Sequence, residues 1–396
     1  MTKKIKIFIF CVVLMDVIGL TILMPVSPYI IREYSTNALA VTLLSAIYAA
    51  AQFLAAPILG LLSDRYGRRP LLLISIFGSA IGYFIFGIGG ALWILFFSRI
   101  IDGITGGNFS IANAYIADIT TDKDRAQSYA LVGSAFGVGF ILGPAVGGLL
   151  SHFALSAPAY TAGILSLISF TVGFFILPES LPKEKRINTK MNAKDFYPLK
   201  SVFKYFRQPH LWVLLLTHML FQLVFTGNNA VYQLFMINKY NIPPASVAVL
   251  LIISGFGNLI TQVFFVGPLV RVIGEKLVVS LSLIGQAIML VFTLLVPSFW
   301  MQYLVILIST AFNGLMWPTL TAMISKSVPQ NEQGSISGVS TSLSSLMGII
   351  GPLVAGMLYD SLGHSAPFLS GAIVFVGTFM LFNIIKNPMS FNNAAE

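Results

Sequence analysis

The sequence contains twelve long apolar stretches with few charged residues, and this feature limits the chain to one class of fold. An α-helix needs about 20 apolar residues to cross the roughly 30 Å hydrocarbon core of a bilayer. The stretches are about twice as long as the strands of a membrane β-barrel and lack their strict alternation. We therefore predict an all-α integral membrane protein with twelve transmembrane helices, at residues 5–30, 40–62, 71–89, 91–117, 127–150, 159–178, 210–237, 246–270, 277–296, 300–325, 334–358 and 366–386.

The composition agrees with a chain that lies in lipid. Charged residues make up 9% of the sequence and hydrophobic residues 56%, whereas a soluble domain carries about 25% charged residues. The single cysteine, Cys11, excludes an internal disulfide and a cysteine-based zinc site. The formal charge of +9 is spread over short segments between the apolar stretches, unlike the basic patch of a nucleic-acid-binding protein. We expect a lipid bilayer as the surroundings and no nucleic-acid partner.

The basic residues also predict the orientation, because cytoplasmic loops of membrane proteins are enriched in Lys and Arg. If the N-terminus is cytoplasmic, about 20 basic residues fall inside and only Arg32 and Lys239 outside. We predict a multi-pass protein of the inner (cytoplasmic) membrane with both termini cytoplasmic. The first stretch contains Asp16 and has no small-residue cleavage site before Arg32, so we expect it to stay as a helix rather than be removed as a signal peptide.

The longest polar stretch divides six apolar stretches from six. It predicts an N-terminal six-helix bundle at 1–178, a cytoplasmic linker with a surface helix at 179–209, and a C-terminal six-helix bundle with a short tail at 210–396.

The two halves repeat each other. GLLSDRYGRR at 60–69 aligns with GPLVRVIGEK at 267–276, an offset of 207 residues, and GPAVGG at 143–148 aligns with GPLVAG at 351–356, an offset of 208. Two matches at nearly one offset indicate duplicated halves, which are typical of secondary transporters.

Three stretches resemble motifs of the major facilitator superfamily, specifically of its twelve-helix drug:proton antiporters. GLLSDRYGRRP at 60–70 is similar to the signature loop between helices 2 and 3, and RIIDGITGG at 99–107 to the arginine-bearing motif of helix 4. GFILGPAVGG at 139–148 resembles the helix 5 motif associated with proton-coupled export. MDVIGLTILMPVSPYIIREY at 15–34 and SDRYGRRPLLLIS at 63–75 are most similar to the tetracycline-efflux group. The resemblance implies two pseudo-symmetric six-helix bundles and exchange of a substrate for protons.

The chain departs from the tetracycline-efflux group at three places. That group carries an acid in helix 3, a histidine in helix 8 and an acid in helix 9, whereas here Gly82 stands at the acid position, 246–270 has no histidine and 277–296 has no acid. These differences leave open a specific metabolite or siderophore transporter on the same scaffold.

The resemblance assigns a conformational switch to the 60–70 loop, and the residue types suit that role. Glycine permits tight turns and close backbone approach, and arginine pairs well with carboxylates. We expect the switch to comprise Gly60, Asp64, Arg65, Gly67, Arg68 and Arg69, with Asp118 and Glu179 as acidic partners. The alternative is that these arginines only fix the topology. Arg271 stands where the second half would need an acid, so we expect the switch to be asymmetric.

The fifth predicted helix is rich in glycine around a proline. Small residues four apart let two helices pack closely, and proline removes one helical hydrogen bond and favours a kink. We predict a hinge at Gly139, Gly143, Pro144, Gly147 and Gly148, with static helix packing as the alternative.

Three charged residues, Asp16, Arg99 and Asp102, lie deep within the predicted spans, away from their ends. At about 1.5 Å per residue, Asp16 is about 16 Å from the inner end of the first helix, and Asp102 is about as far from the outer end of a helix that runs the other way. A charge at that depth costs about 2.5–3.5 kcal/mol. Two acids and one arginine are least costly to bury with one acid protonated, so we predict proton coupling by Asp16, Arg99 and Asp102. Alternatively, Arg99 and Asp102 only neutralise each other, which leaves Asp16 as the proton carrier.

Polar and aromatic side chains on other helices predict a substrate cavity, because polar groups are costly against lipid and aromatic walls suit amphipathic or cationic molecules. The candidates are Met24, Tyr48, Gln52, Phe109, Asn113, Phe136, His218, Gln222, Phe225, Asn229, Gln233, Asn313 and Trp317. For His218 and the amides, packing between helices is the alternative.

These features together predict a secondary active transporter that exports lipophilic or amphipathic, drug or tetracycline-like molecules in exchange for protons by alternating access. The sequence has no HExxH, GKS/T phosphate loop or GxSxG motif, so we expect no enzymatic activity. We likewise expect no metal and no cofactor besides the proton motive force. The resemblance implies a monomer.

Overall fold

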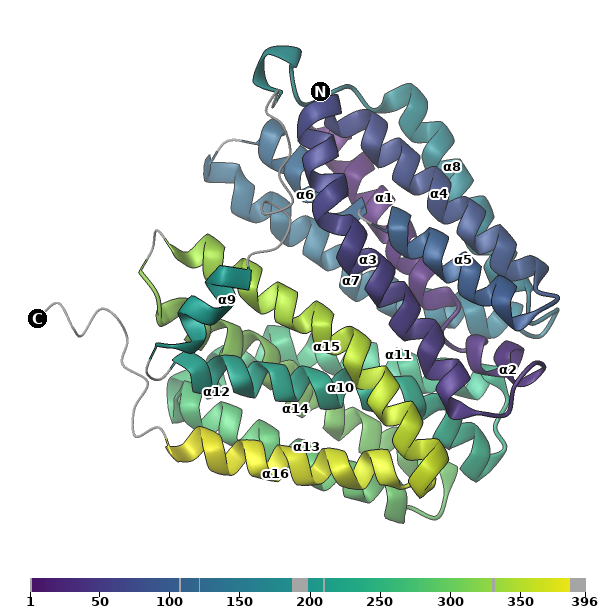
Figure 1. Cartoon of the computed structure of the whole chain (residues 1–396), viewed down its shortest axis with the longest axis vertical. Helices are drawn as coiled ribbons and strands as arrows, with labels where there is room; N and C mark the ends of the chain where they lie inside the picture. Colours follow the sequence, from purple (N-terminus) through teal and green to yellow (C-terminus); the bar gives the residue numbers. More distant parts are fainter. Residues whose placement is uncertain are drawn as a thin grey trace, which may run out of the picture. The chain divides into compact units, whose positions relative to one another are not determined.

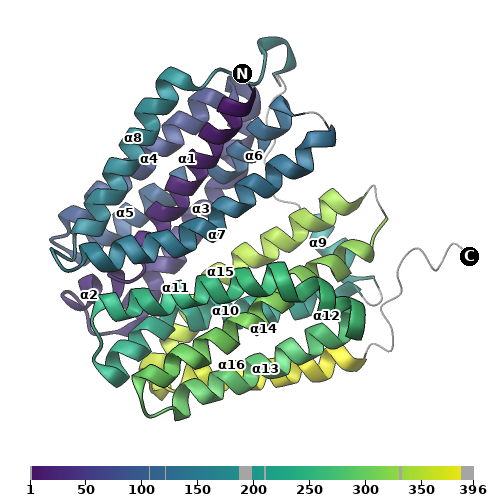
Figure 2. The same cartoon turned by 180° about the vertical axis from the view of Figure 1, so that it is seen from behind.

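Every regular element in the described part of the chain is a helix (Figures 1 and 2). The computed structural model describes residues 2–106, 108–120, 122–186, 199–208, 211–329 and 332–384. The helices of the first half are α1 (Thr2–Ile22), α2 (Ser27–Arg32), α3 (Ala38–Tyr66), α4 (Arg68–Ile88), α5 (Leu92–Thr105), α6 (Asn108–Ile119), α7 (Asp122–Leu150) and α8 (Ala157–Ile176). A 3-10 turn, η1 (Lys183–Lys185), follows. The second half has α9 (Leu199–Phe206), α10 (Leu211–Tyr240), α11 (Pro244–Ile260), the π-helix η3 (Thr261–Phe265), α12 (Val266–Ile273), α13 (Glu275–Leu295), α14 (Phe299–Lys326), α15 (Gln333–Leu362) and α16 (Ala366–Ile384).

Ten helical segments of the described residues are long and apolar enough to cross a membrane. The predicted spans at 91–117 and 127–150 correspond to α5 with α6 and to α7; they are not among the ten, so the twelve-span topology and the placement of the termini stay predictions. Large apolar side chains such as Trp93 and Ile373 are 68% and 73% exposed, which suits a surface that faces lipid rather than water. The chain is therefore an all-helical, multi-pass membrane protein.

Two helix breaks in the first unit lie at glycine or proline residues. α4 ends at Ile88, and Gly89 and Gly90 both have positive φ, 61° and 88°. This is a backbone region that glycine adopts without a steric cost, so the chain can reverse before α5. The first span is also interrupted: α1 ends at Ile22 and α2 begins at Ser27, with Pro25 in the intervening turn. The break at Gly89 and Gly90 confirms the expected boundary between the spans at 71–89 and 91–117, whereas the break after Ile22 divides the predicted span at 5–30.

The contacts divide the chain into two compact units. The first comprises Met1–Phe196 with Ile242–Ile252, and the second comprises Tyr197–Asn241 with Ile253–Glu396. The predicted domain boundaries at 178 and 210 stay a prediction.

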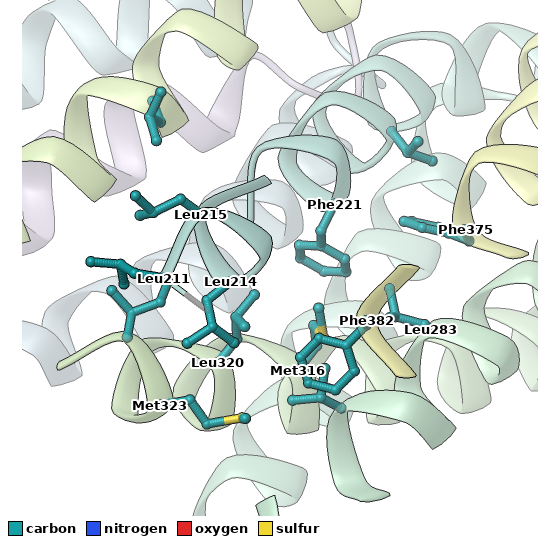
Figure 3. Close-up of a cluster of buried hydrophobic side chains, with 14 of the residues drawn as sticks. Leu211, Leu214, Leu215, Phe221, Leu283, Met316, Leu320, Met323, Phe375 and Phe382 are labelled. Carbon is teal, nitrogen blue, oxygen red and sulfur yellow. The ribbon is translucent and has the colours of Figure 1, made fainter. Parts of the chain in front are cut away.

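Each unit has its own hydrophobic core. In the first unit, Ile9 and Val13 of α1 meet Leu72 of α4 and Tyr115 of α6. The core of the second unit, shown in Figure 3, brings α10, α13, α14 and α16 together through side chains that include Leu214, Leu215, Phe221, Leu283, Leu320, Met316, Phe375 and Phe382.

In the first unit, the glycines of α7 let that helix lie directly against α1. A Cβ added at Gly139 would lie 2.6 Å from Val17, and one at Gly143 would overlap the Thr21 hydroxyl. A Cβ at Gly147 would overlap the carbonyl of Ile22. The close approach allows the Thr21 hydroxyl to donate across the interface to the carbonyl of Gly139 (3.0 Å). Small residues at four-residue spacing thus form a packed interface. This contact corresponds to static helix packing, the alternative to a hinge.

The second unit contains the same interface. The Thr226 hydroxyl of α10 donates to the Met347 carbonyl of α15 (2.9 Å), and a Cβ at Gly351 would overlap that hydroxyl. Residues 21 and 226 differ by 205, and residues 139 and 347 by 208. The sequence repeat therefore corresponds to a repeated contact within each unit.

Candidate functional site

The charged centre of the first unit is an ion pair on one helix. Arg99 and Asp102 are one turn apart on α5, and Nη1 of Arg99 lies 3.0 Å from Oδ2 of Asp102. The side chains are 7% and 3% exposed. A buried charge is costly unless it is paired, so mutual neutralisation makes both residues tolerable in this apolar unit.

Two aromatic rings of α4 hold the Arg99 guanidinium. Its Cζ lies 4.9 Å from the ring centroid of Phe86 and 5.5 Å from that of Tyr83, within the range of a cation–π interaction. Among the described residues, Nε and Nη2 of Arg99 are buried without a hydrogen-bond partner. Arg99 therefore has two unused donors beside its ion pair.

Asp16 belongs to the same electrostatic neighbourhood. The charges of Asp16, Asp102 and Arg99 all act on the hydroxyl groups of Tyr48 and Tyr83. Asp16 therefore lies in the same part of the first unit as the Arg99–Asp102 pair, and proton coupling by the three residues stays a prediction. Tyr83 was not among the sequence candidates. Nothing in the sequence distinguishes it from other aromatic residues, and only the packing of α4 against α5 shows that its ring contacts Arg99.

Glycines set the position of Tyr83 and of α1. A Cβ added at Gly19, one turn after Asp16, would lie 2.9 Å from the Tyr83 hydroxyl. Gly82 performs a similar role on α4, since a Cβ there would lie 3.0 Å from Cβ of Asp102 and 3.2 Å from the Ser98 carbonyl. A larger side chain at position 82 would therefore press tightly against the Ser98–Asp102 turn of α5.

Two predicted cavity residues of α3, Tyr48 and Gln52, lie next to Gly103 and Gly106 at the C-terminal end of α5. Nε2 of Gln52 donates to the Gly106 carbonyl (2.9 Å) and lies 3.3 Å from the Tyr48 hydroxyl. A Cβ at Gly103 would come within 2.7 Å of the Tyr48 carbonyl. Tyr48 and Gln52 therefore form a polar layer next to the ion pair, and their contact with a substrate stays a prediction.

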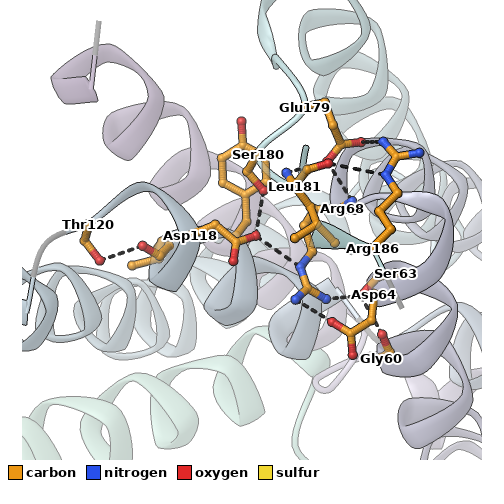
Figure 4. A network of polar contacts seen from close by, with 12 residues as sticks. Gly60, Ser63, Asp64, Arg68, Asp118, Thr120, Glu179, Ser180, Leu181 and Arg186 are labelled. Carbon is orange, nitrogen blue, oxygen red and sulfur yellow. Dashed lines mark hydrogen bonds and ion pairs between the residues drawn. The ribbon is translucent and has the colours of Figure 1, made fainter. Parts of the chain in front are cut away.

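A second polar network surrounds Arg68 at the start of α4 (Figure 4). Its guanidinium contacts three side chains: Nη2 lies 2.5 Å from Oδ1 of Asp64, Nη1 donates to Oγ of Ser63 (2.6 Å), and Nε donates to Oδ2 of Asp118 (3.2 Å). The expected pairing of the loop with Asp118 is confirmed as a contact. Arg68 ties the ends of α3 and α6 to the start of α4.

Glu179 completes this network from the segment after α8. Its Oε1 accepts hydrogen bonds from the backbone N–H groups of Arg68 (2.9 Å) and Leu181 (3.1 Å), and its Oε2 lies 3.6 Å from Nη2 of Arg186. A carboxylate at a helix N-terminus satisfies a backbone donor that the helix leaves free. Gly67 has φ 109°, and a Cβ there would overlap the Glu179 carboxylate, so both conformation and space require glycine.

The other switch candidates have different neighbours. Arg65 is exposed with its guanidinium 5.6 Å from the Tyr66 ring centroid, and Arg69 donates to the Phe174 carbonyl (2.6 Å) rather than to an acid. The expectation that Gly60 allows a close approach is wrong, because it lies inside α3 and a Cβ there would meet nothing within 4 Å. Its carbonyl instead accepts from Ser63 (2.7 Å). The roles of Gly60, Arg65 and Arg69 in switching stay predictions.

Pro144 and Gly148 complete the predicted hinge. Pro144 lies inside the continuous helix α7. A Cβ at Gly148 would lie 2.5 Å from Ala248, which belongs to the same unit. Bending at this position stays a prediction.

In the second unit, His218 is a hydrogen-bonded and packed residue. Its Nε2 lies 2.8 Å from Oγ of Ser344 on α15, and its ring centroid lies 5.4 Å from that of Trp317 on α14. His218 is only 3% exposed. This geometry corresponds to the packing alternative. Ser344 was missed from the sequence because α15 contains many serines without a distinguishing pattern.

The remaining cavity candidates divide by exposure. Trp317 and Asn229 are exposed, Gln222 is buried with its Oε1 lacking a partner among the described residues, and Gln233, Asn313 and Met24 are half-buried. Phe136 packs against the core of the first unit and Phe225 against that of the second. The side chains of Phe109 and Asn113 lie outside the described residues. Substrate contact by any of these residues stays a prediction.

Comparison with known proteins places these motifs in a family. The family model described as Major Facilitator Superfamily matches residues 9–236 and 214–394. The chain is 36% identical to the class C tetracycline resistance protein of Escherichia coli, over 88% of this chain and 87% of that protein. It is 30% identical to multidrug resistance protein 2 of Bacillus subtilis (strain 168), over 95% of this chain and 94% of that protein.

Solved structures share the fold. The nucleoside transporter NupG has a TM-score of 0.79 at 14% identity, covering 96% of this chain and 98% of that chain. The human organic anion transporter MFSD10 has a TM-score of 0.71 at 23% identity, covering 96% of this chain and 99% of that chain.

Proposed function

The chain belongs to the major facilitator superfamily of membrane transporters, and we propose that it exports lipophilic or amphipathic small molecules in exchange for protons by alternating access. The names of its relatives, tetracycline and multidrug resistance proteins, support export of drug-like compounds. Residence in the inner membrane, a monomeric state and the proton motive force as the only energy source are parts of the same proposal.

The observation that carries the proposal is the buried charge cluster of the first unit. Arg99 and Asp102 form a close pair, so these two charges balance each other. Asp16 adds a further carboxyl group to the same neighbourhood. Burying a second negative charge beside one arginine is costly, and protonation of one acid removes that cost. In this proposal Asp16 is the carboxyl group that takes up and releases the proton.

Arg99 provides a way to link the proton to a conformational change. Its two unused donors are aimed into a buried, aromatic environment, where an unpaired donor is costly. A shift of the guanidinium toward Asp16 would favour the ionised carboxylate and release its proton. A shift back to Asp102 alone would favour the protonated form. The two states differ in the charge partner of Arg99, which is the differential interaction that coupling requires.

The substrate class follows from the side chains available in each unit. Trp317 is 41% exposed although it lies within a span, and Tyr48 and Gln52 form a polar layer in the first unit. Aromatic rings with a few amide and hydroxyl groups suit amphipathic molecules of varied shape. Gly82 supplies no charge beside α5, so charge-specific recognition at this position is not part of the proposal. A specific metabolite or siderophore transporter remains the second candidate.

The test is transport by Asp16→Asn in inside-out proteoliposomes with an acidic interior. We expect the wild-type protein to accumulate ethidium and tetracycline and to raise the internal pH as protons leave. Asp16→Asn should lose both signals, while Asp102→Asn serves as the comparison for the other acid. An unchanged elution profile and melting temperature would show that the variant is folded.

Two results would contradict this proposal. Normal gradient-driven accumulation by Asp16→Asn would show that this carboxyl group does not carry the proton. Failure of the folded wild-type protein to move either probe would favour the metabolite or siderophore transporter instead.

A further inference from the structure

The turn before α13 copies the turn before α4. Gly67 and Gly274 differ by 207 in number, and each is the N-cap of the helix that follows. Their backbone angles are alike, φ 109° and ψ 156° at Gly67 against φ 80° and ψ 156° at Gly274. The first residue of the helix is Arg68 in one half and Glu275 in the other. The repeat therefore extends from sequence to backbone conformation at this turn.

An ion pair joins each of these helix starts to the end of a neighbouring helix. In the first unit, Nε of Arg68 lies 3.2 Å from Oδ2 of Asp118, at the end of α6. In the second unit, Nζ of Lys326, the last residue of α14, lies 2.5 Å from Oε1 of Glu275. Residues 118 and 326 differ by 208. The two ion pairs occupy corresponding places, with the charges exchanged.

The exchange of charge extends to other residues of the motif. Asp64 corresponds to Arg271, and Glu179 corresponds to Lys386, both at an offset of 207; Lys386 lies outside the described residues. An ion pair needs opposite signs but not a particular direction, so inversion of all members preserves the contact. The expectation of an asymmetric switch, drawn from Arg271 alone, missed the pair between Glu275 and Lys326.

We propose that Glu275 and Lys326 form a second conformational switch, a charge-inverted counterpart of the contact between Arg68 and Asp118. This inference rests on the proposed transport cycle and adds two positioning residues to it. The pair fixes the start of α13 against the end of α14. α14 also carries Trp317, whose ring contacts His218, so the pair controls a helix that bears a candidate substrate residue.

The exposure of the pair suits a contact that opens in each cycle. The side chain of Lys326 is 60% exposed and that of Glu275 is 24% exposed, whereas Arg68 is 11% exposed and also bonds to Ser63 and Asp64. Exposed ion pairs are weak, so the second switch opens more readily than the first. A carboxylate at the first position of α13 also interacts favourably with the helix dipole, which gives Glu275 a stable place when Lys326 departs.

The competing explanation is that Lys326 only contributes positive charge to a cytoplasmic loop. The two explanations differ in what they require of Glu275. Under the topology explanation, Glu275→Gln is harmless because it makes the loop more positive, and only Lys326→Gln matters. Under the switch explanation, both variants break the same contact and have the same effect.

The experiment compares Glu275→Gln, Lys326→Gln and the exchanged pair Glu275→Lys with Lys326→Glu, each as the full chain in lipid. Ethidium uptake gives the maximal rate and the half-saturating concentration. Hydrogen–deuterium exchange measures opening at the start of α13 without any need for transport. We expect each single variant to speed exchange there and to change the maximal rate by about two- to fivefold, the range of an exposed ion pair, with the half-saturating concentration unchanged.

Controls separate charge pairing from other effects. Glu275→Asp and Lys326→Arg keep both signs and should behave like the wild-type protein. The exchanged pair should recover most of the loss, except for the dipole penalty of a lysine at the first position of α13. Two results would overturn the switch. One is a Glu275→Gln variant with wild-type exchange and transport rates while Lys326→Gln is slower in transport. The other is an exchanged pair whose transport rate is no closer to that of the wild-type protein than the rate of either single variant.

Failure of the proposed transport function gives a different pattern. If the wild-type protein does not move ethidium while the single variants still speed exchange, the ion pair stands and the transport proposal fails. If the wild-type protein transports ethidium and the single variants alter neither exchange nor rate, the switch fails alone.

Discussion

Replacement of Gly67 by alanine tests whether the contact with Glu179 or only the backbone conformation requires glycine. Gly274→Ala is a matched control, because Gly274 has the same kind of positive φ but nothing within 4 Å of an added Cβ. At Gly67 the added Cβ would overlap the Glu179 carboxylate. Both substitutions strain the backbone at a positive φ, and only Gly67→Ala also disturbs the Glu179 carboxylate.

The magnitudes follow from the geometry of the two turns. A non-glycine residue held in this backbone region costs about 1–3 kcal/mol, and both variants incur that cost. Gly67→Ala also displaces Glu179 from the N–H groups of Arg68 and Leu181, at 2.9 and 3.1 Å. A hydrogen bond to a charged group contributes about 1.5–3 kcal/mol. Because the Glu179 side chain is 26% exposed, solvent weakens both bonds, and we take about 1 kcal/mol for each and about 2 kcal/mol for both together, which is below that range.

The assay is thermal unfolding of the purified protein, with all variants heated at one rate. We expect Gly274→Ala to melt below the wild-type protein and Gly67→Ala to melt lower again, by about 4–8 °C for about 2 kcal/mol in a unit of this size. In a Glu179→Ala background, the extra loss at Gly67 should disappear, since neighbouring effects are not additive. Equal losses at Gly67 and Gly274 in the wild-type background would refute the role of the Glu179 contact.

Three further predictions concern helix packing and the surface. Gly143→Ala places a Cβ on the Thr21 hydroxyl and should destabilise the protein by about 1–3 kcal/mol, measured as the unfolding free energy in denaturant. Thr21→Val and Thr226→Val each remove one bond between helices; each should cost about 0.6 kcal/mol and at most about 1.7 kcal/mol, and markedly unequal losses would contradict the repeat of this contact. The hydrogen bond from Lys204 (2.7 Å) lowers the pKa of Glu332 below its ordinary value of 4.5. Its stabilising contribution is therefore present above pH 4.5 and is lost as the pH falls through the lowered pKa. The melting temperature of Glu332→Gln should lie slightly below that of the wild-type protein at pH 7 and equal it at strongly acid pH; a difference that persists in acid would contradict the contribution of this pair.

Much of the candidate site was predictable because its residues are unusual for their surroundings. Asp16, Arg99 and Asp102 stand out as charges in apolar spans, and their cost in lipid restricts them to the interior of the bundle. The close packing at Gly143 was also predictable, since four-residue glycine spacing has a direct geometric meaning. The choice of Asp102 as the partner of Arg99 was not, because it depends on side-chain conformation and on the position of α1 relative to α5.

The residues that sequence reasoning missed are ordinary for their surroundings. Tyr83 is one aromatic residue in an aromatic-rich span, and its contact with Arg99 arises only when α4 lies beside α5. The Glu275–Lys326 pair spans 51 residues, and neither residue type is unusual at the end of a helix. Conversely, Gly60 belongs to a recognisable motif, yet a Cβ added there would meet nothing within 4 Å.

The sequence by itself determined the class of this protein, ten of its predicted helical spans and the repeat of its halves. These properties follow from hydrophobicity and spacing, which act along the chain and need no knowledge of neighbours. Only the tertiary structure decided which groups pair: Arg68 with Asp64 and Asp118, and Lys326 with Glu275. Hydrogen bonds and close ion pairs need polar atoms within about 3–4 Å of each other, so partner choice depends on how distant helices are brought together.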